Sequence, residues 1–110
     1  MMDIKLLSAD ELKALMKQKK VYLVDVRMQE EYKSGHIKGA VNIPCEEIEE
    51  MENNNTSLFK KFADMKKCGY SIVFYCRSGS RSMICARILK EQGIDCSSLY
   101  GGIEEFVIDE

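Results

Sequence analysis

Two short, almost unbroken apolar runs divide the chain, one over residues 21–26 and the other over residues 71–76. Continuous apolar runs, unlike alternating ones, are typical of strands that are buried on both faces of a parallel sheet. Two further strands are expected near residues 40–41, just before Pro44, and near residues 95–99. The apolar pattern therefore predicts a buried sheet whose strands are separated by long connections.

Helical patterns fill these connections. Ser8 and Glu11 have the spacing of a capping box, and apolar residues follow at helical intervals as far as Met16. We expect further helices over residues 28–34, 46–51, 57–66 and 79–92, a turn over 53–55, and a short closing helix after 101–102. The predicted apolar stripe of the helix over 79–92, which Gly93 should end, consists of Met83, Ile84, Ile88 and Leu89.

Strands that alternate with helices predict an α/β fold, with a central, mostly parallel sheet flanked by helices in three layers. The 110 residues are enough for one hydrophobic core. The chain shows no internal repeat and no low-complexity linker. We therefore expect a single domain over residues 1–110.

Composition and charge narrow the class of protein. Apolar residues make up 45% of the chain and charged residues 31%, which excludes a disordered tail. A net charge of -2 argues against a nucleic-acid binder, which would have a basic excess. No apolar stretch is long enough to span a membrane, and the first residues lack a secretory pattern. A cytoplasmic protein that binds neither membrane nor nucleic acid is expected.

The chain has five cysteines and one histidine, the residues that indicate whether it could bind a metal ion or form disulfide bonds. The cysteines stand at positions 45, 68, 76, 85 and 96, so none forms a Cys-x-x-Cys pair. Such spacing does not predict a metal site, and an odd number of cysteines does not suggest a disulfide framework. We expect free thiols and no metal or other cofactor, which leaves a cysteine as a candidate nucleophile.

The best candidate lies in the run Cys76-Arg77-Ser78-Gly79-Ser80-Arg81, between a buried strand and a helix. Backbone N–H groups at a helix N-terminus, and a turn that leads into it, bind anions. Two arginines add positive charge. These features favour the thiolate, and comparable settings lower a cysteine pKa from about 8.5 to roughly 3.5–7.5. The loop therefore fits a small oxyanion that carries an electrophilic atom, such as thiosulfate, phosphate or arsenate.

This loop and several further motifs, taken together, resemble those of the single-domain rhodaneses, a family of thiosulfate sulfurtransferase-like proteins. Its motifs here are Asp25-Val26-Arg27, Glu31-Tyr32, Gly35-His36-Ile37-Lys38-Gly39-Ala40, Asn42-Ile43-Pro44, the loop that begins at Cys76, and Tyr100-Gly101-Gly102. The resemblance spans residues 4–107, although Ile103 stands where the family commonly has a tryptophan. We expect this difference to loosen the closing segment without touching the chemistry.

The resemblance implies an enzyme with a rhodanese-like fold and a persulfide mechanism. Cys76 would take the sulfane sulfur of thiosulfate or a similar donor, then pass it to cyanide or a thiol. The resemblance implies that substrate is bound by Arg77, Ser78, Gly79, Ser80 and Arg81. The expected partners are thus a small anionic sulfur donor and a thiophilic acceptor, either of which could be a protein.

Two other functions stay open at this point. In a sulfur-carrier or interaction module, Cys76 would instead be loaded by a partner protein. The resemblance implies that a phosphatase or arsenate reductase of related fold would use a loop one residue longer than the six residues from Cys76 to Arg81, so this alternative is less favoured. The resemblance and the sequence position assign structural roles to His36, Asp25 and Arg27, with an Arg27–Glu31 pair on the following helix.

Cys45 is a candidate resolving thiol for an oxidised or persulfidated Cys76. An inert thiol is the simpler interpretation of this position. Cys85 lies too far along the predicted helix for direct pairing with Cys76.

Overall fold

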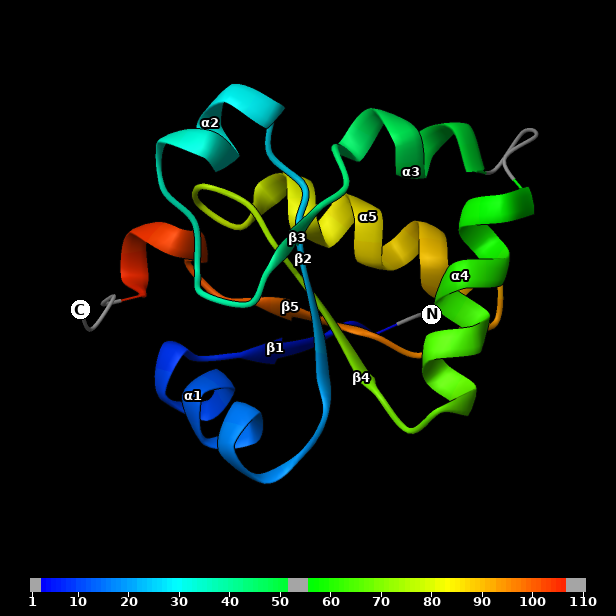
Figure 1. The fold of residues 1–110 in the computed structure, drawn as a ribbon, viewed down its shortest axis with the longest axis horizontal. Coiled ribbons are helices and arrows are strands. Elements are labelled where there is room, and N and C mark those ends of the chain that lie inside the picture. The colour runs from blue at the N-terminus through cyan, green and yellow to red at the C-terminus, as the bar shows by residue number, and fades with distance from the viewer. Residues whose placement is uncertain (1–2, 52–55, 107–110) are drawn as a thin grey trace.

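The computed structural model describes residues 3–51 and 56–106, so the turn expected over 53–55 lies outside the described residues. The strands are β1 (Lys5–Leu7), β2 (Val21–Asp25), β3 (Val41–Asn42), β4 (Ser71–Tyr75) and β5 (Ser97–Leu99). The helices are α1 (Ala9–Gln18), α2 (Gln29–Ser34), α3 (Cys45–Met51), α4 (Thr56–Lys67), α5 (Ser80–Glu91) and a final 3-10 helix, η1 (Gly102–Glu105) (Figure 1).

The strands form one five-stranded sheet in the order β1-β5-β4-β2-β3, and every neighbouring pair is parallel. The predicted α/β class is confirmed, as are four of the strands. The sequence did not predict β1, which has only three residues and shows too little pattern. It exists because Leu6 pairs with Ser98 of β5, a contact between distant parts of the chain.

The sheet is the middle of three layers (Figure 1). Ile72 and Phe74 of β4 face a core that α3, α4 and α5 cover, because alternate residues of a strand point to opposite faces. Val73 and Tyr75 face the other core, which α1 and η1 cover. Both faces of β4 are therefore buried, which explains its continuous apolar run.

The predicted apolar stripe of α5 is partly wrong. Ile88 and Leu89 are buried as part of the core, but 48% of the surface of Ile84 is exposed. The buried face also includes Ser82 and Cys85, which are fully buried at helical spacing with Leu89. Small side chains at the first two positions let the helix start lie close to the sheet. The buried face of α5 therefore combines small residues at its start with large apolar residues nearer its end.

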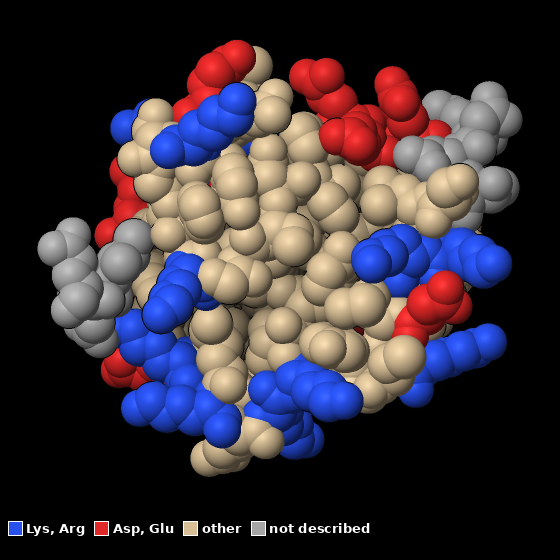
Figure 2. All heavy atoms as spheres, in the orientation of Figure 1, with Lys and Arg blue, Asp and Glu red and all other residues tan. Residues whose placement is uncertain are grey.

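The helix α3 carries an acidic outer surface. Glu46, Glu47, Glu49 and Glu50 are exposed, and acidic side chains gather over this helix in Figure 2, whereas Lys and Arg lie mainly along the opposite edge. Ile48 and Met51 of the same helix point into the core. Among the described residues, no helix is both long enough and apolar enough to cross a membrane.

A buried ion pair fixes the chain just after β2. Asp25 is fully buried, and Arg27 donates to it from its backbone N–H, from Nε at 3.0 Å and from Nη2 at 2.7 Å. The same Nη2 donates to the carbonyl of Gly35 at 2.6 Å. Asn42 donates to the carbonyls of Asp25 and Arg27, both at 3.0 Å. This network ties β2 to β3 and to the end of α2.

Breaking the buried pair should cost much of the protein's stability. We expect Asp25→Asn to lower the free energy of unfolding by about 3–5 kcal/mol, because it leaves the Arg27 charge buried without a counter-charge. Urea denaturation followed by circular dichroism measures this. Glu104→Gln is the matched control, since it removes an exposed ion pair with Arg77 and should change little. Equal losses in the two variants would contradict the assignment.

Candidate active site

The candidate site lies at the carboxyl end of the sheet, where two neighbouring strands send the chain in opposite directions. The connection after β2 leads to β3 on one side, and the connection after β4 leads to β5 on the other. Such a switch point opens a crevice in parallel α/β sheets. Cys76 directly follows β4, and Arg27 follows β2, so both stand at this crevice.

The Cys76 thiol is held in a cradle of N–H groups. Its Sγ accepts from the N–H of Gly79 at 3.0 Å and from the N–H of Ser82 at 3.5 Å. The turn is possible because Gly79 has φ +111°, in the left-handed region that other residues avoid. The Ser82 hydroxyl lies 3.5 Å from the same sulfur. The thiol therefore meets several hydrogen-bond donors at the start of α5.

These contacts oppose the effect of burial on the thiol. Burial favours the neutral thiol and would raise the pKa of Cys76. Hydrogen bonds from the Ser82 hydroxyl and from the N–H groups of Ser82, Gly79 and Ser78 outweigh it, so this pKa lies below its ordinary value. A larger fraction of Cys76 is therefore thiolate at neutral pH than for an ordinary cysteine.

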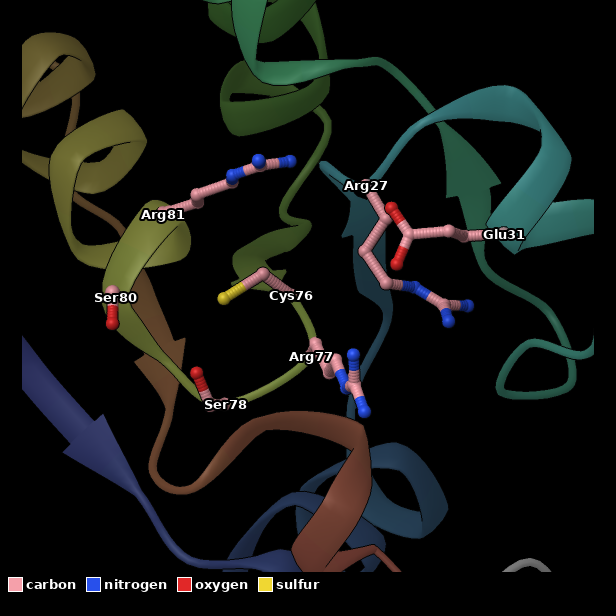
Figure 3. A pocket seen from close by; sticks show the side chains of 7 residues that line it. All are labelled: Arg27, Glu31, Cys76, Arg77, Ser78, Ser80 and Arg81. Atoms are coloured by element: carbon pink, nitrogen blue, oxygen red, sulfur yellow. The ribbon is translucent and has the colours of Figure 1, made fainter.

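The thiol faces a cavity of about 290 Å³. Figure 3 shows Arg77 and Arg81 at the two ends of the loop, with Arg27 and Glu31 facing it across the opening. The cavity is lined by Arg27, Glu31, Cys76, Arg77, Ser78, Ser80 and Arg81. Gly79, also expected to bind substrate, is outside this lining and instead donates its N–H to the sulfur.

The charges around the cavity are partly neutralised. Arg27 is paired with Asp25, and the exposed Arg77 lies 3.6 Å from Glu104. The predicted Arg27–Glu31 pair on α2 is wrong, because Arg27 precedes the helix and turns inward to Asp25. The carboxylate of Glu31 instead accepts from the N–H of Met28 at 3.3 Å. Among the described cavity-lining arginines, Arg81 is therefore the one without an ion pair.

The single histidine packs away from the thiol. Its Nδ1 lies 2.8 Å from the carbonyl oxygen of Tyr32, and the two rings stack with centroids 3.8 Å apart. Tyr32 in turn donates to the carbonyl of Ala40 at 2.6 Å. These contacts tie the segment between α2 and β3 back onto α2, in agreement with the structural role expected for His36.

Three of the other four thiols are hydrogen-bonded to groups other than Cys76. Cys45 and Cys85 approach each other with their sulfurs 3.0 Å apart, and burial raises the pKa of both. Burial also raises the pKa of Cys96 to about 12, whereas Cys68 is exposed. A resolving role for Cys45 thus stays a prediction. Among residues 3–51 and 56–106, no three His, Cys, Asp or Glu side chains are grouped to hold a metal ion.

The closing segment supports the thiol loop through backbone hydrogen bonds. The N–H of Ile103 donates to the carbonyl of Cys76 at 2.9 Å. The N–H of Glu104 donates to the carbonyl of Arg77 at 3.2 Å. Gly102, at φ +64°, lies so close that a Cβ would be 2.5 Å from the Arg77 carbonyl oxygen. The loop backbone is therefore held from behind by η1, whatever side chain stands at position 103.

Together, these features define a parallel α/β domain that presents a cysteine within a loop of N–H donors beside arginine side chains. The family model described as "Rhodanese-like domain" matches residues 8–109, and the chain belongs to this family.

Relatives and solved structures agree with the assignment. Over 85 residues the chain is 40% identical to Rhodanese domain-containing protein CG4456 of Drosophila melanogaster, covering 74% of this chain and 77% of that protein. Over 98 residues it is 30% identical to human thiosulfate:glutathione sulfurtransferase, covering 86% and 85%. A rhodanese-like domain protein from Staphylococcus aureus superposes with TM-score 0.74 at 29% identity, covering 96% and 94%.

Gly102 provides a test of how far η1 supports the site. We expect Gly102→Ala to reduce the free energy of unfolding by more than the roughly 1–2 kcal/mol that left-handed backbone alone costs a residue with a side chain. It should also slow alkylation of Cys76, because the loop carbonyls must shift. Gly93→Ala is the control, since Gly93 has φ +90° but open space around it. Matching results for both variants would show that η1 does not support the loop.

Proposed function

We propose that the protein is a sulfurtransferase that carries a sulfane sulfur as a persulfide on Cys76. The observation that carries this proposal is the Cys76 sulfur in an N–H cradle, 3.0 Å from the nitrogen of Gly79, facing a small cavity with arginines on its rim. A thiolate held in this way is ready to attack without a general base. The family and the name of the human relative support the same class of reaction.

The reaction has two half-reactions. The Cys76 thiolate attacks the outer sulfur of thiosulfate, an S–S bond forms to Cys76, and the bond to the sulfonate sulfur breaks. Sulfite leaves with the bonding electron pair, and the product is a Cys76 persulfide anion. An acceptor thiolate or cyanide then attacks the outer sulfur, which regenerates the Cys76 thiolate. Because sulfite leaves before the acceptor binds to the persulfide form of the enzyme, ping-pong kinetics are expected.

The loop residues share the binding of the anions. N–H groups of Ser78, Gly79 and Ser80 would stabilise the charged outer sulfur of the persulfide. Arg81 would bind the sulfonate of the donor through charge-assisted hydrogen bonds, with a smaller contribution from Arg77 because Glu104 is close to it. No cofactor is needed in this scheme.

Thiosulfate is the proposed donor, and a small thiol or cyanide the proposed acceptor. The name of the human relative pairs thiosulfate with glutathione, which supports both choices. In this proposal, residues 1–110 form a single domain that carries the activity. A reducing compartment such as the cytoplasm suits it, because the nucleophile must remain a free thiol.

Sulfur transfer to Cys76 can be measured directly. After incubation of the reduced protein with thiosulfate, intact mass spectrometry should show a gain of one sulfur atom. Cys76→Ser should show none, while Cys68→Ser, which removes an exposed thiol outside the site, should behave as wild type. Subsequent addition of cyanide should remove the extra mass and release thiocyanate.

Other outcomes favour the other functions. No mass gain with thiosulfate, but a gain with a protein persulfide donor, would favour a sulfur carrier. Hydrolysis of a phosphate ester without any persulfide would favour a phosphatase. A mass gain that persists in Cys76→Ser would overturn the assignment of the nucleophile.

The role of Arg81 gives a second prediction for this site. Arg81→Ala should lower kcat/KM for thiosulfate about tenfold, chiefly through KM, because a charge-assisted hydrogen bond to the donor is lost. Arg87→Ala is the matched control, since it removes an exposed arginine from the same helix outside the cavity lining. Steady-state thiocyanate production measures both. A larger loss in Arg87→Ala would count against direct binding by Arg81.

A further inference from the structure

Two buried hydroxyl groups lie behind the thiol, one on α5 and one on β5. Ser82 and Ser98 are both fully buried, and their Oγ atoms are 2.8 Å apart. Ser82 lies in the first turn of α5, next to Cys76, whereas Ser98 comes from the neighbouring strand of the sheet. Burying a hydroxyl group costs free energy unless it is hydrogen-bonded, so each of these two hydroxyl protons should have an acceptor.

The number of protons decides which serine donates. In the part of the chain that the structure describes, the only partner of the Ser98 hydroxyl is the Ser82 oxygen. A hydroxyl has one proton to donate, so a Ser98 that only accepted would bury an unpaired O–H group. Ser98 therefore donates to Ser82. The Ser82 proton is then available for a different acceptor.

Two acceptors are within reach of that proton. The carbonyl of Gly79 lies 3.1 Å from the Ser82 oxygen, and the Cys76 sulfur lies 3.5 Å from it. When Cys76 is a neutral thiol, its S–H can donate to Ser82 while Ser82 donates to Gly79. When Cys76 is a thiolate, the better acceptor is the charged sulfur, and the Ser82 hydroxyl turns to it. The donation from Ser98 satisfies the oxygen of Ser82 in both states.

We propose that Ser98 is a positioning residue for Cys76, which acts through Ser82: by donating to the Ser82 oxygen, it directs and polarises the Ser82 O–H toward the Cys76 thiolate. Hydrogen bonds in such a chain strengthen one another where water is excluded. Ser98 would thereby favour the thiolate without contacting the thiol or any substrate. The inference rests on the proposed role of Cys76 as the nucleophile and adds a residue from β5 that lies outside the loop.

The ionisation of Cys76 is the property to measure. The rate of iodoacetamide alkylation at Cys76, followed by mass spectrometry of its peptide from pH 5 to pH 10, reports the thiolate fraction. In Ser98→Ala the midpoint should move to higher pH, with an alkylation rate about two- to tenfold lower at pH values below the midpoint. At high pH the two profiles should converge, because Cys76 is then fully ionised in both proteins.

Matched variants separate a positioning role from a general loss of structure. Ser97→Ala changes the adjacent residue of β5, which is only partly buried, and should leave the alkylation profile unchanged. Ser82→Ala should raise the midpoint more than Ser98→Ala does. The double variant Ser82→Ala/Ser98→Ala should have the same midpoint as Ser82→Ala alone, because Ser98 acts only through Ser82.

The outcomes are distinct. An unchanged midpoint in Ser98→Ala, or additive shifts in the double variant, would overturn the proposal. Should Ser98→Ala fold poorly, the comparison of Ser82→Ala with the double variant still tests it, since this double variant leaves no unpaired hydroxyl. A wild-type protein that gains no sulfur from thiosulfate would defeat the proposed function but leave the alkylation result intact, so the two failures can be told apart.

Discussion

The organisation of the site depends on burying a thiol at the end of a central strand while surrounding it with hydrogen-bond donors. Burial alone would keep Cys76 neutral, and the donors of the loop reverse that preference. Both conditions are met because β4 runs directly into a turn at Gly79, whose left-handed backbone aims its N–H group at the sulfur 3.0 Å away. The cavity, the flanking arginines and the start of α5 are arranged around this turn.

Three distant segments hold the turn in place. The buried Asp25–Arg27 pair fixes the connection after β2, which forms the opposite wall of the cavity. The helix η1 binds the loop carbonyls from behind. The strand β5 places Ser98 2.8 Å from Ser82, so that the Ser82 hydroxyl, 3.5 Å from the sulfur, is itself hydrogen-bonded to the sheet. The chemistry proposed for Cys76 thus draws on residues from both halves of the chain.

Much of the fold and the position of the candidate site could be predicted from the local pattern of apolar and polar residues. Continuous apolar runs predicted the central strands β2 and β4, and the sequence also placed Cys76 correctly between a strand and a helix. β1 was missed, since it forms only by pairing with β5. The buried face of α5 was partly wrong because Ser82 and Cys85 pack there in place of Ile84. Small residues that pack closely give no periodic apolar signal.

The sequence by itself determined the α/β class, the family and the identity of the candidate nucleophile, because each depends on residues that are close along the chain. Only the tertiary structure decided which groups surround that nucleophile. The N–H of Ile103 in η1 donates to the carbonyl of Cys76, and the Ser82–Ser98 pair joins α5 to the strand β5. Such contacts follow from the order of strands in the sheet, which no local pattern of residues specifies.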